Sequence, residues 1–369
     1  MQNSLRQWVI VLAGLMVGAL AMAGYFYMIY SRVVVRPRLP AIIAGRIEPT
    51  PTPDPLAVYS VLLLGYGGND HEGGYLTDTM ILARVEPKRS EVTLISIPRD
   101  VWVELPLGTS GNNTHKINTA YAFGLDDRQF PHKPVEFTGE AGGGQLAKHA
   151  VASVLGIPVD YFISLSFNGF RESIDVLGGV DIDVPHTFDD YLYPVPEERE
   201  NDCGKSPEDI ETITATLSGT LLEQEFPCRY EHLHFDEGSE YMVGERALKF
   251  VRSRKSDNYG GDYNRSFRQL ALLEAVKDKI ISIGFIPKII PFTSSLTNDM
   301  QTDIDASVIS DKLKTSPDPS TFTIRTISLS DENVLKESRS VDGQYILVPA
   351  IDEGWSTVHE YIQKELNVP

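Results

Sequence analysis

The chain has 369 residues, of which 42% are hydrophobic and 23% charged, so it is long enough to bury the core of one large domain or two. Its formal net charge is -18 at pH 7, and no helix-turn-helix or zinc-finger spacing occurs. Because affinity for nucleic acid comes largely from cationic groups that neutralise phosphates, this composition argues against a nucleic-acid-binding protein.

The N-terminal segment 8–30 contains no charged residue and is long enough to cross a bilayer as a helix. Aromatic residues mark both of its ends, as is typical at membrane interfaces. A cleaved signal peptide is the alternative, but the apolar run continues past the small residues at 19–21, which favours a retained signal-anchor. More arginines follow the segment than precede it, and a literal count of them would place the body of the protein in the cytoplasm.

Residues 32–57 contain many prolines and predict an extended spacer between the anchor and the folded body. The folded part opens with a short apolar run at 59–65 that ends in glycine, which indicates a buried strand. Two further strands, at 80–85 and 91–97, are expected to form a hairpin through a turn at 86–89.

Downstream of the hairpin, helical and strand patterns alternate. We expect helices at 141–155, 167–177, 238–251 and 264–283, and strands at 161–166 and 180–184. Interleaved strands and helices around a hairpin predict an α/β or α+β fold with a mixed sheet. The last segment, 286–369, has weaker periodicity and is taken as a C-terminal extension packed on the same domain.

The two cysteines, Cys203 and Cys228, bracket a polar segment. They lack the neighbouring Cys or His residues that a zinc site needs. A disulfide between them would suit an extracytoplasmic compartment, and two unrelated free thiols are the alternative.

Four arginines fall within seventeen positions, which is unexpected in so acidic a chain; they are Arg252, Arg254, Arg265 and Arg268. The planar guanidinium matches the geometry of phosphate oxygens. Asp262 stands at helical spacing from Arg265 and from Arg268 or Gln269, so these side chains would share one face of a helix. A salt-bridged surface helix is the alternative.

A second arginine and aspartate pair, Arg99 and Asp100, follows the predicted strand 91–97. Two separated clusters of arginine and aspartate suggest one site that holds a phosphate ester and a metal ion. Arg252 and Arg254 are two positions apart, and an extended backbone would direct both side chains to the same side.

Several short blocks occur in a fixed order between residues 58 and 285. They are LLLG at 62–65, TDTM at 77–80, SIPRD at 96–100, KINTAY at 116–121, FNGF at 167–170, LGGVD at 177–181 and GERAL at 244–248, followed by the arginine-rich blocks. In this order they resemble the LytR-CpsA-Psr family of cell-wall phosphotransferases. The resemblance covers 58–285 as the catalytic domain, whereas an insertion at about 189–232 lies outside the common pattern.

The resemblance implies a single-pass protein of the cell membrane with its globular domain outside the cytoplasm. It implies an α-β-α sandwich with a central mixed sheet. The implied activity transfers a glycopolymer phosphate from a polyprenyl-pyrophosphate lipid onto peptidoglycan or a comparable wall acceptor, with Mg²⁺ as cofactor. Phosphoryl transfer depends mainly on positioning and charge neutralisation, which fits a site rich in arginine and aspartate.

Most of the expected site residues are carried over from the family by position. Asp262 and Arg268 are added from the arginine-rich blocks, and Asp70 is added as a substitute metal ligand. The expected catalytic residues are Arg99, Asp100 and Asp262. The expected pyrophosphate ligands are Arg99, Arg252, Arg254, Arg265, Arg268 and Gln269. The expected metal ligands are Asp78, Asp100 and Asp70, and two carboxylates would suffice because Mg²⁺ completes its shell with water and phosphate oxygens.

Two positions depart from the family pattern. Gly67 stands where many relatives carry an aspartate, and Leu76 stands where they often carry an arginine. Asp70, or else His71, from the glycine-rich loop would then replace the missing metal ligand, although this loop could also be a flexible solvent loop. The departures motivate a second hypothesis, a non-catalytic protein of the cell envelope that binds polyprenyl-phosphate lipids.

Overall fold

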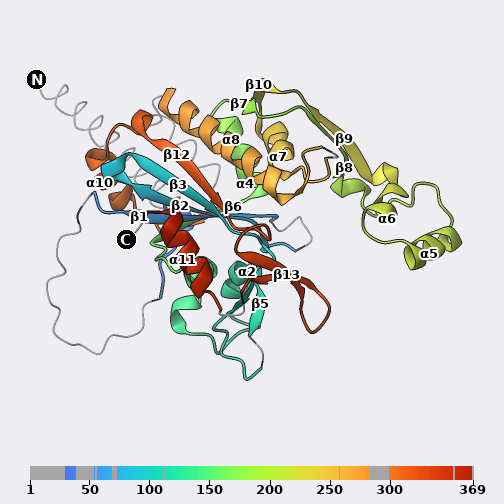
Figure 1. The fold of residues 1–369 in the computed structure, drawn as a ribbon, viewed down its shortest axis with the longest axis horizontal. Coiled ribbons are helices and arrows are strands. Elements are labelled where there is room, and N and C mark those ends of the chain that lie inside the picture. The colour runs from blue at the N-terminus through green and yellow to red at the C-terminus, as the bar shows by residue number, and fades with distance from the viewer. Residues whose placement is uncertain are drawn as a thin grey trace, which may run out of the picture. The chain divides into compact units, whose positions relative to one another are not determined.

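The computed structural model describes residues 30–38, 54, 56–68, 73–111, 113–256, 258–282, 299–351 and 354–367. The chain divides into two compact units. The first unit comprises residues 1–169 and 286–369, and the second comprises residues 170–285 (Figure 1).

A six-stranded sheet in the order β11-β6-β1-β2-β3-β12 forms the centre of the first unit (Figure 1). Its strands are β1 (Tyr59–Tyr66), β2 (Thr77–Glu86), β3 (Glu91–Ser96), β6 (Tyr161–Ser166), β11 (Met300–Thr302) and β12 (Thr323–Ser328). β2 is antiparallel to β1 and β3, whereas β1 and β6 are parallel, as are β3 and β12. The predicted mixed sheet of an α/β fold is therefore confirmed.

Apolar side chains on the sheet explain why these segments form strands. Alternate residues of β1 are buried, among them Leu62 and Leu64, and β3 buries Ile95 in the same cluster. Helix α3 (Gly142–Leu155) lays Leu146 and Val154 into this core, and both are fully buried. Removal of such surface from water is the main contribution to stability.

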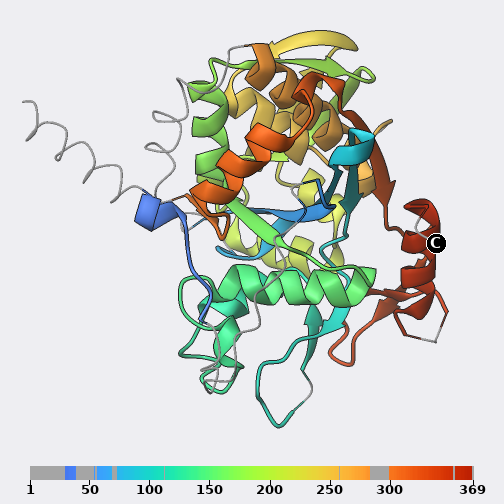
Figure 2. The same cartoon turned by 90° about the vertical axis from the view of Figure 1, so that its left-hand side faces the viewer.

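The C-terminal segment is part of the central sheet. It supplies both edge strands, β11 and β12, and continues into the hairpin of β13 (Leu335–Arg339) and β14 (Tyr345–Pro349). Helix α11 (Ser356–Glu365) lies against α3 (Figure 2). The segment was expected to pack on the domain as an extension, but the sheet is incomplete without it.

The remaining elements of the first unit are short. They are η1 (Pro87–Arg89), β4 (Trp102–Glu104), β5 (Thr114–Lys116), α2 (Thr119–Leu125), η2 (Val135–Phe137), α10 (Ala306–Thr315) and η6 (Pro319–Thr321). β4 and β5 pair as an antiparallel hairpin, with Trp102 opposite Lys116.

The second unit combines helices with two pairs of antiparallel strands. Its elements are α4 (Phe167–Val176, which begins in the first unit), β7 (Val180–Val184), β8 (Phe188–Pro194), β9 (Tyr230–Phe235), β10 (Gly238–Met242), α7 (Gly244–Arg252) and α8 (Gly261–Ser282). The helix predicted at 238–251 is wrong in its first part, because residues 238–242 pair with β7 as a strand. That prediction extended the helical pattern of α7 across the turn before Gly244.

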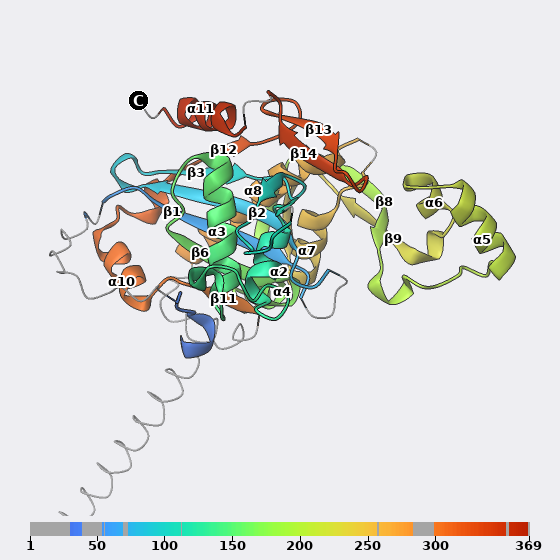
Figure 3. The same ribbon diagram turned by 90° about the horizontal axis from the view of Figure 1, so that it is seen from below.

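The insertion is a two-stranded ribbon with a helical tip. β8 and β9 form the ribbon, and η3 (Pro196–Glu198), α5 (Pro207–Thr216), α6 (Thr220–Gln224) and η4 (Pro227–Arg229) lie between them in sequence (Figure 3). The structure pairs Cys203 with Cys228, with their Cα atoms 5.7 Å apart. This disulfide closes the tip over 25 residues of sequence.

Within the described ranges, no helix has both the length and the apolar character needed to span a membrane. The predicted anchor at 8–30 lies outside the described residues except for Tyr30, and most of the predicted spacer lies outside them too.

The contact between α3 and β6 gives a test of the core. A Cβ atom added at Gly144 would lie 2.2 Å from ring atoms of Phe162, which is fully buried. Gly144→Ala should therefore lower the free energy of unfolding by about 1–3 kcal/mol, even though alanine is the better helix former. Gly111→Ala is the control, because nothing lies within 4 Å of an added Cβ there. Urea unfolding of both variants checks this, and a Gly144→Ala protein as stable as the parent would contradict the packing.

Candidate functional site

Arg99 lies between two aspartates just beyond the end of β3. Its Nη1 atom donates to Asp78 Oδ1 at 2.5 Å, and its Nε atom lies 3.6 Å from Asp100 Oδ2. Lys116 Nζ donates to the other oxygen of Asp100 at 2.6 Å. These four residues, the Arg99 cluster, therefore hold two positive and two negative charges in one network.

The β2–β3 register brings Asp78 to Arg99. Ile81 pairs with Ser96, and the Ile97 N–H donates to the Met80 carbonyl at 3.0 Å. Continued by two further residues along each strand, this antiparallel register places Asp78 opposite Arg99. The length of the β2–β3 hairpin, which is set by the sequence, therefore determines the Asp78–Arg99 ion pair.

The β4–β5 hairpin brings Lys116 to Asp100. The Ile117 N–H donates to the Val101 carbonyl at 2.7 Å, and the Asn118 N–H donates to the Arg99 carbonyl at 3.3 Å. The chain after β5 thus runs back along residues 99–101, and Lys116 comes beside the carboxylate of Asp100.

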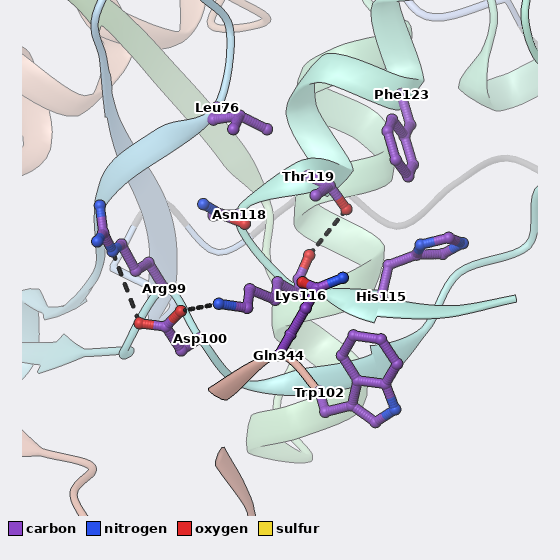
Figure 4. Close-up of a pocket in the computed structure, with 10 residues that line it drawn as sticks. All are labelled: Leu76, Arg99, Asp100, Trp102, His115, Lys116, Asn118, Thr119, Phe123 and Gln344. Atoms are coloured by element: carbon purple, nitrogen blue, oxygen red, sulfur yellow. Dashed lines mark hydrogen bonds and ion pairs between the residues drawn. The ribbon is translucent and has the colours of Figure 1, made fainter. Parts of the chain in front are cut away.

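A pocket of about 460 Å³ opens beside the Arg99 cluster (Figure 4). It is lined by Leu76, Arg99, Asp100, Trp102, His115, Lys116, Asn118, Thr119, Phe123 and Gln344. Charged side chains line one end, and the aromatic side chains of Trp102, His115 and Phe123 line the other (Figure 4). The pocket volume lies in the range of small-molecule sites.

Asn118 contributes an unsatisfied polar atom to this pocket. Its carbonyl accepts hydrogen bonds from the Thr77 N–H at 3.1 Å and the Thr77 hydroxyl at 3.3 Å. Its side-chain Oδ1, in contrast, is buried and has no hydrogen-bond partner within the described part of the chain. A buried acceptor without a donor is costly, so this oxygen is an unfavourable feature of the pocket wall.

Sequence reasoning assigned no role to several of these residues. Lys116 and Asn118 lie in a block quoted for the family resemblance, which was the available signal. Trp102, His115 and Gln344 had no signal of their own, because hairpin pairing brings them to the pocket from separate segments.

The arginine-rich segment lies in the second unit. Arg252 is the last residue of α7, and its Nη1 donates to the Tyr193 hydroxyl at 3.3 Å. The expectation of an extended backbone at Arg252 is therefore wrong, since the chain leaves the helix only at Ser253. Arg265 and Gln269 lie one turn apart on α8, as the helical spacing predicted. Asp262 also lies on α8, but its side chain is outside the described atoms.

Arg268 was predicted to bind pyrophosphate, but its side chain is buried and bonded to the protein backbone. The residue is 2% exposed, and its guanidinium donates to the carbonyls of Tyr259 and Ser253. It also lies over the ring of Phe188 at 4.7 Å. Burial lowers the pKa of Arg268 to about 10, which leaves it charged at neutral pH. This environment gives Arg268 a structural role in holding the backbone.

Asp190, which is negatively charged, contacts the same segment, residues 253–255, as Arg268 does. It is fully buried, and its Oδ2 accepts from the Ser253 hydroxyl at 2.7 Å and from the backbone N–H groups of Arg254 and Lys255 at 3.1 Å. Asp190 and Arg268 therefore fix the backbone of the loop that carries Arg254. A single aspartate at the start of an insertion offered no sequence signal for this role.

The structure describes Leu76 and Gly67, the two positions that depart from the family pattern. Leu76 lines the pocket beside the Arg99 cluster, where an arginine was expected from the family. Gly67 is buried at the end of β1. Asp70 and His71, the expected substitutes for a metal ligand, lie outside the described residues.

The loop around Arg254 gives a second test. Asp190→Asn keeps the shape of the side chain but removes its charge and places an N–H₂ group where donors now point. We expect a loss of about 2 kcal/mol or more in the free energy of unfolding, measured in urea. Asp183→Asn, at an exposed position of β7, is the matched control and should change stability by less than about 0.5 kcal/mol. Equal stability of the two variants would contradict the role given to Asp190.

Comparisons with curated relatives agree with the predicted resemblance. A Bacillus subtilis protein named polyisoprenyl-teichoic acid–peptidoglycan teichoic acid transferase TagV is 28% identical over 249 residues, which cover 67% of this chain and 50% of that protein. TagU of Oceanobacillus iheyensis, a transferase of the same description, is 27% identical over 318 residues, covering 84% and 80% of the two chains. This chain thus spans half the length of the first relative.

Solved structures support the fold. A Streptococcus agalactiae protein superposes with a TM-score of 0.56 at 24% identity, covering 84% of this chain and 88% of that one. Bacillus subtilis TagV gives a TM-score of 0.51 at 23% identity, covering 85% and 99%. The model of the LytR_cpsA_psr family matches residues 51–358. The chain therefore belongs to the LytR_cpsA_psr family.

Proposed function

We propose that this protein transfers a glycopolymer phosphate from a polyprenyl-pyrophosphate carrier onto peptidoglycan or a comparable wall acceptor. The observation that carries the proposal is the Arg99 cluster, which opens onto a pocket in a member of this family. The names of the TagU and TagV relatives describe the same class of transfer between a polyisoprenyl-linked polymer and peptidoglycan.

The Arg99 cluster suits phosphoryl transfer because this reaction needs positioned charge more than covalent chemistry. In the proposed reaction an acceptor hydroxyl oxygen bonds to the phosphorus that carries the glycopolymer. The bond from this phosphorus to the bridging oxygen breaks, polyprenyl phosphate leaves with that oxygen, and the hydroxyl proton passes to water. Arg99 and Lys116 would bind the phosphate oxygens, while Asp78 and Asp100 orient the two cations through their ion pairs.

The charge balance of the cluster favours Mg²⁺ as cofactor. Two cations and two carboxylates sum to a formal charge of zero, and a diphosphate adds about two negative charges, one per phosphate. A divalent cation would offset them and stabilise charge on the transferring phosphoryl group.

The donor set fits such an ion. Asp78 and Asp100 would supply carboxylate oxygens. In the described part of the chain no three acidic, histidine or cysteine side chains are grouped as a metal site. Mg²⁺ does not require such a group, because one or two carboxylates usually suffice. Asp70 as a further ligand stays a prediction.

The predicted roles of the second unit also stay predictions. They are pyrophosphate binding by Arg252, Arg254, Arg265 and Gln269, and a catalytic role for Asp262. The same applies to a single-pass anchor and an extracytoplasmic body. The Cys203–Cys228 pair supports an oxidising compartment.

Turnover of a polyprenyl-diphosphate-linked glycan in the presence of Mg²⁺ tests the proposal. Arg99→Ala should lower kcat/KM by at least about 30-fold, since it removes a charge-assisted contact to phosphate, and Arg99→Lys should restore only part of it. Lys88→Ala, which removes an exposed cation paired with Asp54, is the control and should keep full activity. Parental activity in Arg99→Ala would contradict the site. Tight lipid binding without any turnover by the parent protein would favour the non-catalytic hypothesis.

The compartment can be tested through the disulfide. After mild reduction of intact cells, a membrane-impermeant thiol reagent should label Cys203 and Cys228 if the body lies outside the membrane. The Cys203→Ser, Cys228→Ser double variant controls for labelling of other proteins. Labelling that occurs only after lysis would contradict the extracytoplasmic assignment.

A further inference from the structure

The aromatic end of the pocket is built by three separate elements. Trp102 comes from β4, His115 from β5 and Phe123 from α2, and all three are partly exposed (Figure 4). The rings of Trp102 and His115 lie 6.4 Å apart at 52°, and those of His115 and Phe123 lie 5.1 Å apart in an edge-to-face arrangement. Aromatic faces thus line the pocket on the side away from Arg99 (Figure 4).

The aromatic end of the pocket also carries polar groups that can hydrogen-bond to a ligand. Among the residues that the structure describes, neither the Trp102 indole N–H nor the ring nitrogens of His115 make a hydrogen bond to protein, and neither group is sealed from solvent. Burial lowers the pKa of His115, so the imidazole is neutral at pH 7 and offers one donor and one acceptor. The aromatic end therefore combines apolar faces with uncharged hydrogen-bonding groups.

These properties distinguish between possible ligands. An isoprenoid tail would leave the indole N–H and the imidazole nitrogens desolvated without partners, which is unfavourable. A pyranose ring presents C–H groups to aromatic faces and hydroxyl groups to neutral donors and acceptors at its edge. The phosphate of a sugar phosphate would extend toward Lys116 and Arg99 at the charged end of the same pocket.

We propose that Trp102, His115 and Phe123 form a subsite for a pyranose ring next to the phosphate-binding Arg99 cluster. This inference rests on the proposed function, which supplies a sugar on either side of the reacting phosphorus. The ring could belong to the transferred glycopolymer or to the wall acceptor, and both present the same chemistry to the subsite.

The first test uses soluble probes on the full chain. Inorganic phosphate and glucose 1-phosphate have similar charge, so their difference in affinity reports the sugar. The parent protein should bind glucose 1-phosphate more tightly, and Trp102→Ala should reduce this preference about tenfold without changing the affinity for phosphate. Trp102→Phe, which keeps a ring face, should retain most of it. His115→Gln provides an independent variant if Trp102→Ala fails to fold.

Tryptophan fluorescence gives a direct readout, because the chain contains only three tryptophans, Trp8, Trp102 and Trp355. Glucose 1-phosphate should change the emission of the parent and of Trp355→Phe, the matched control whose ring packs on the hydrophobic core. The same probe should leave the emission of Trp102→Phe unchanged. Equal affinity for the two probes in the parent, or an unchanged preference in both Trp102→Ala and His115→Gln, would overturn the subsite.

Kinetics with the lipid-linked donor identify the sugar and separate the two proposals. A rise in KM for the donor alone in Trp102→Ala assigns the ring to the glycopolymer, and a rise in KM for the acceptor alone assigns it to the wall. Trp102-dependent binding of glucose 1-phosphate without any turnover would contradict the proposed function but support the subsite. Normal turnover and unchanged KM values in Trp102→Ala would overturn the subsite alone.

Discussion

The ion pairs of Arg99 are the constraint on which the candidate site depends. One guanidinium contacts the carboxylates of Asp78 and Asp100, and Lys116 holds the far side of Asp100. Each ion is partly exposed, so the network is worth little as a contribution to stability. Its value lies in orientation, since it holds two cations in fixed positions beside a pocket.

Several parts of the first unit must be in place for this arrangement. The β2–β3 hairpin sets Asp78 opposite Arg99, and the chain after β5 is tied to residues 99–101 by backbone hydrogen bonds. The C-terminal hairpin closes the pocket, because the Leu347 N–H donates to the Asp100 carbonyl at 2.9 Å and Gln344 lines the wall. A segment far along the sequence thus fixes the residue at the centre of the site.

In the second unit, two buried charged residues also orient a segment that carries an arginine. Asp190 and Arg268 contact the loop of Arg254 through its backbone N–H and carbonyl groups, and each is almost completely buried. Taking these charges out of water is costly, and the cost is offset because each carries several hydrogen bonds. An arginine in a segment predicted to bind phosphate can therefore have a structural role.

These details explain what could and could not be predicted from the sequence. Short apolar runs located β1, β3 and β6 to within a few residues, and the Asp78–Arg99 pair follows from the length of a predicted hairpin. Short edge strands such as β11 carry too few residues to give a pattern, so the C-terminal segment was not recognised as part of the sheet. Trp102, His115 and Gln344 meet only through tertiary pairing, and burial of Arg268 depends on neighbours that a motif does not specify.

The central claim is that Arg99 and Lys116 form the phosphate-binding end of the pocket. A crystal structure of the protein with a short-chain prenyl diphosphate and Mg²⁺ tests it most directly. We expect diphosphate oxygens within hydrogen-bonding distance of Arg99 and Lys116, with the ion beside Asp78 and Asp100. A diphosphate bound elsewhere, without contact to Arg99 or Lys116, would contradict the account.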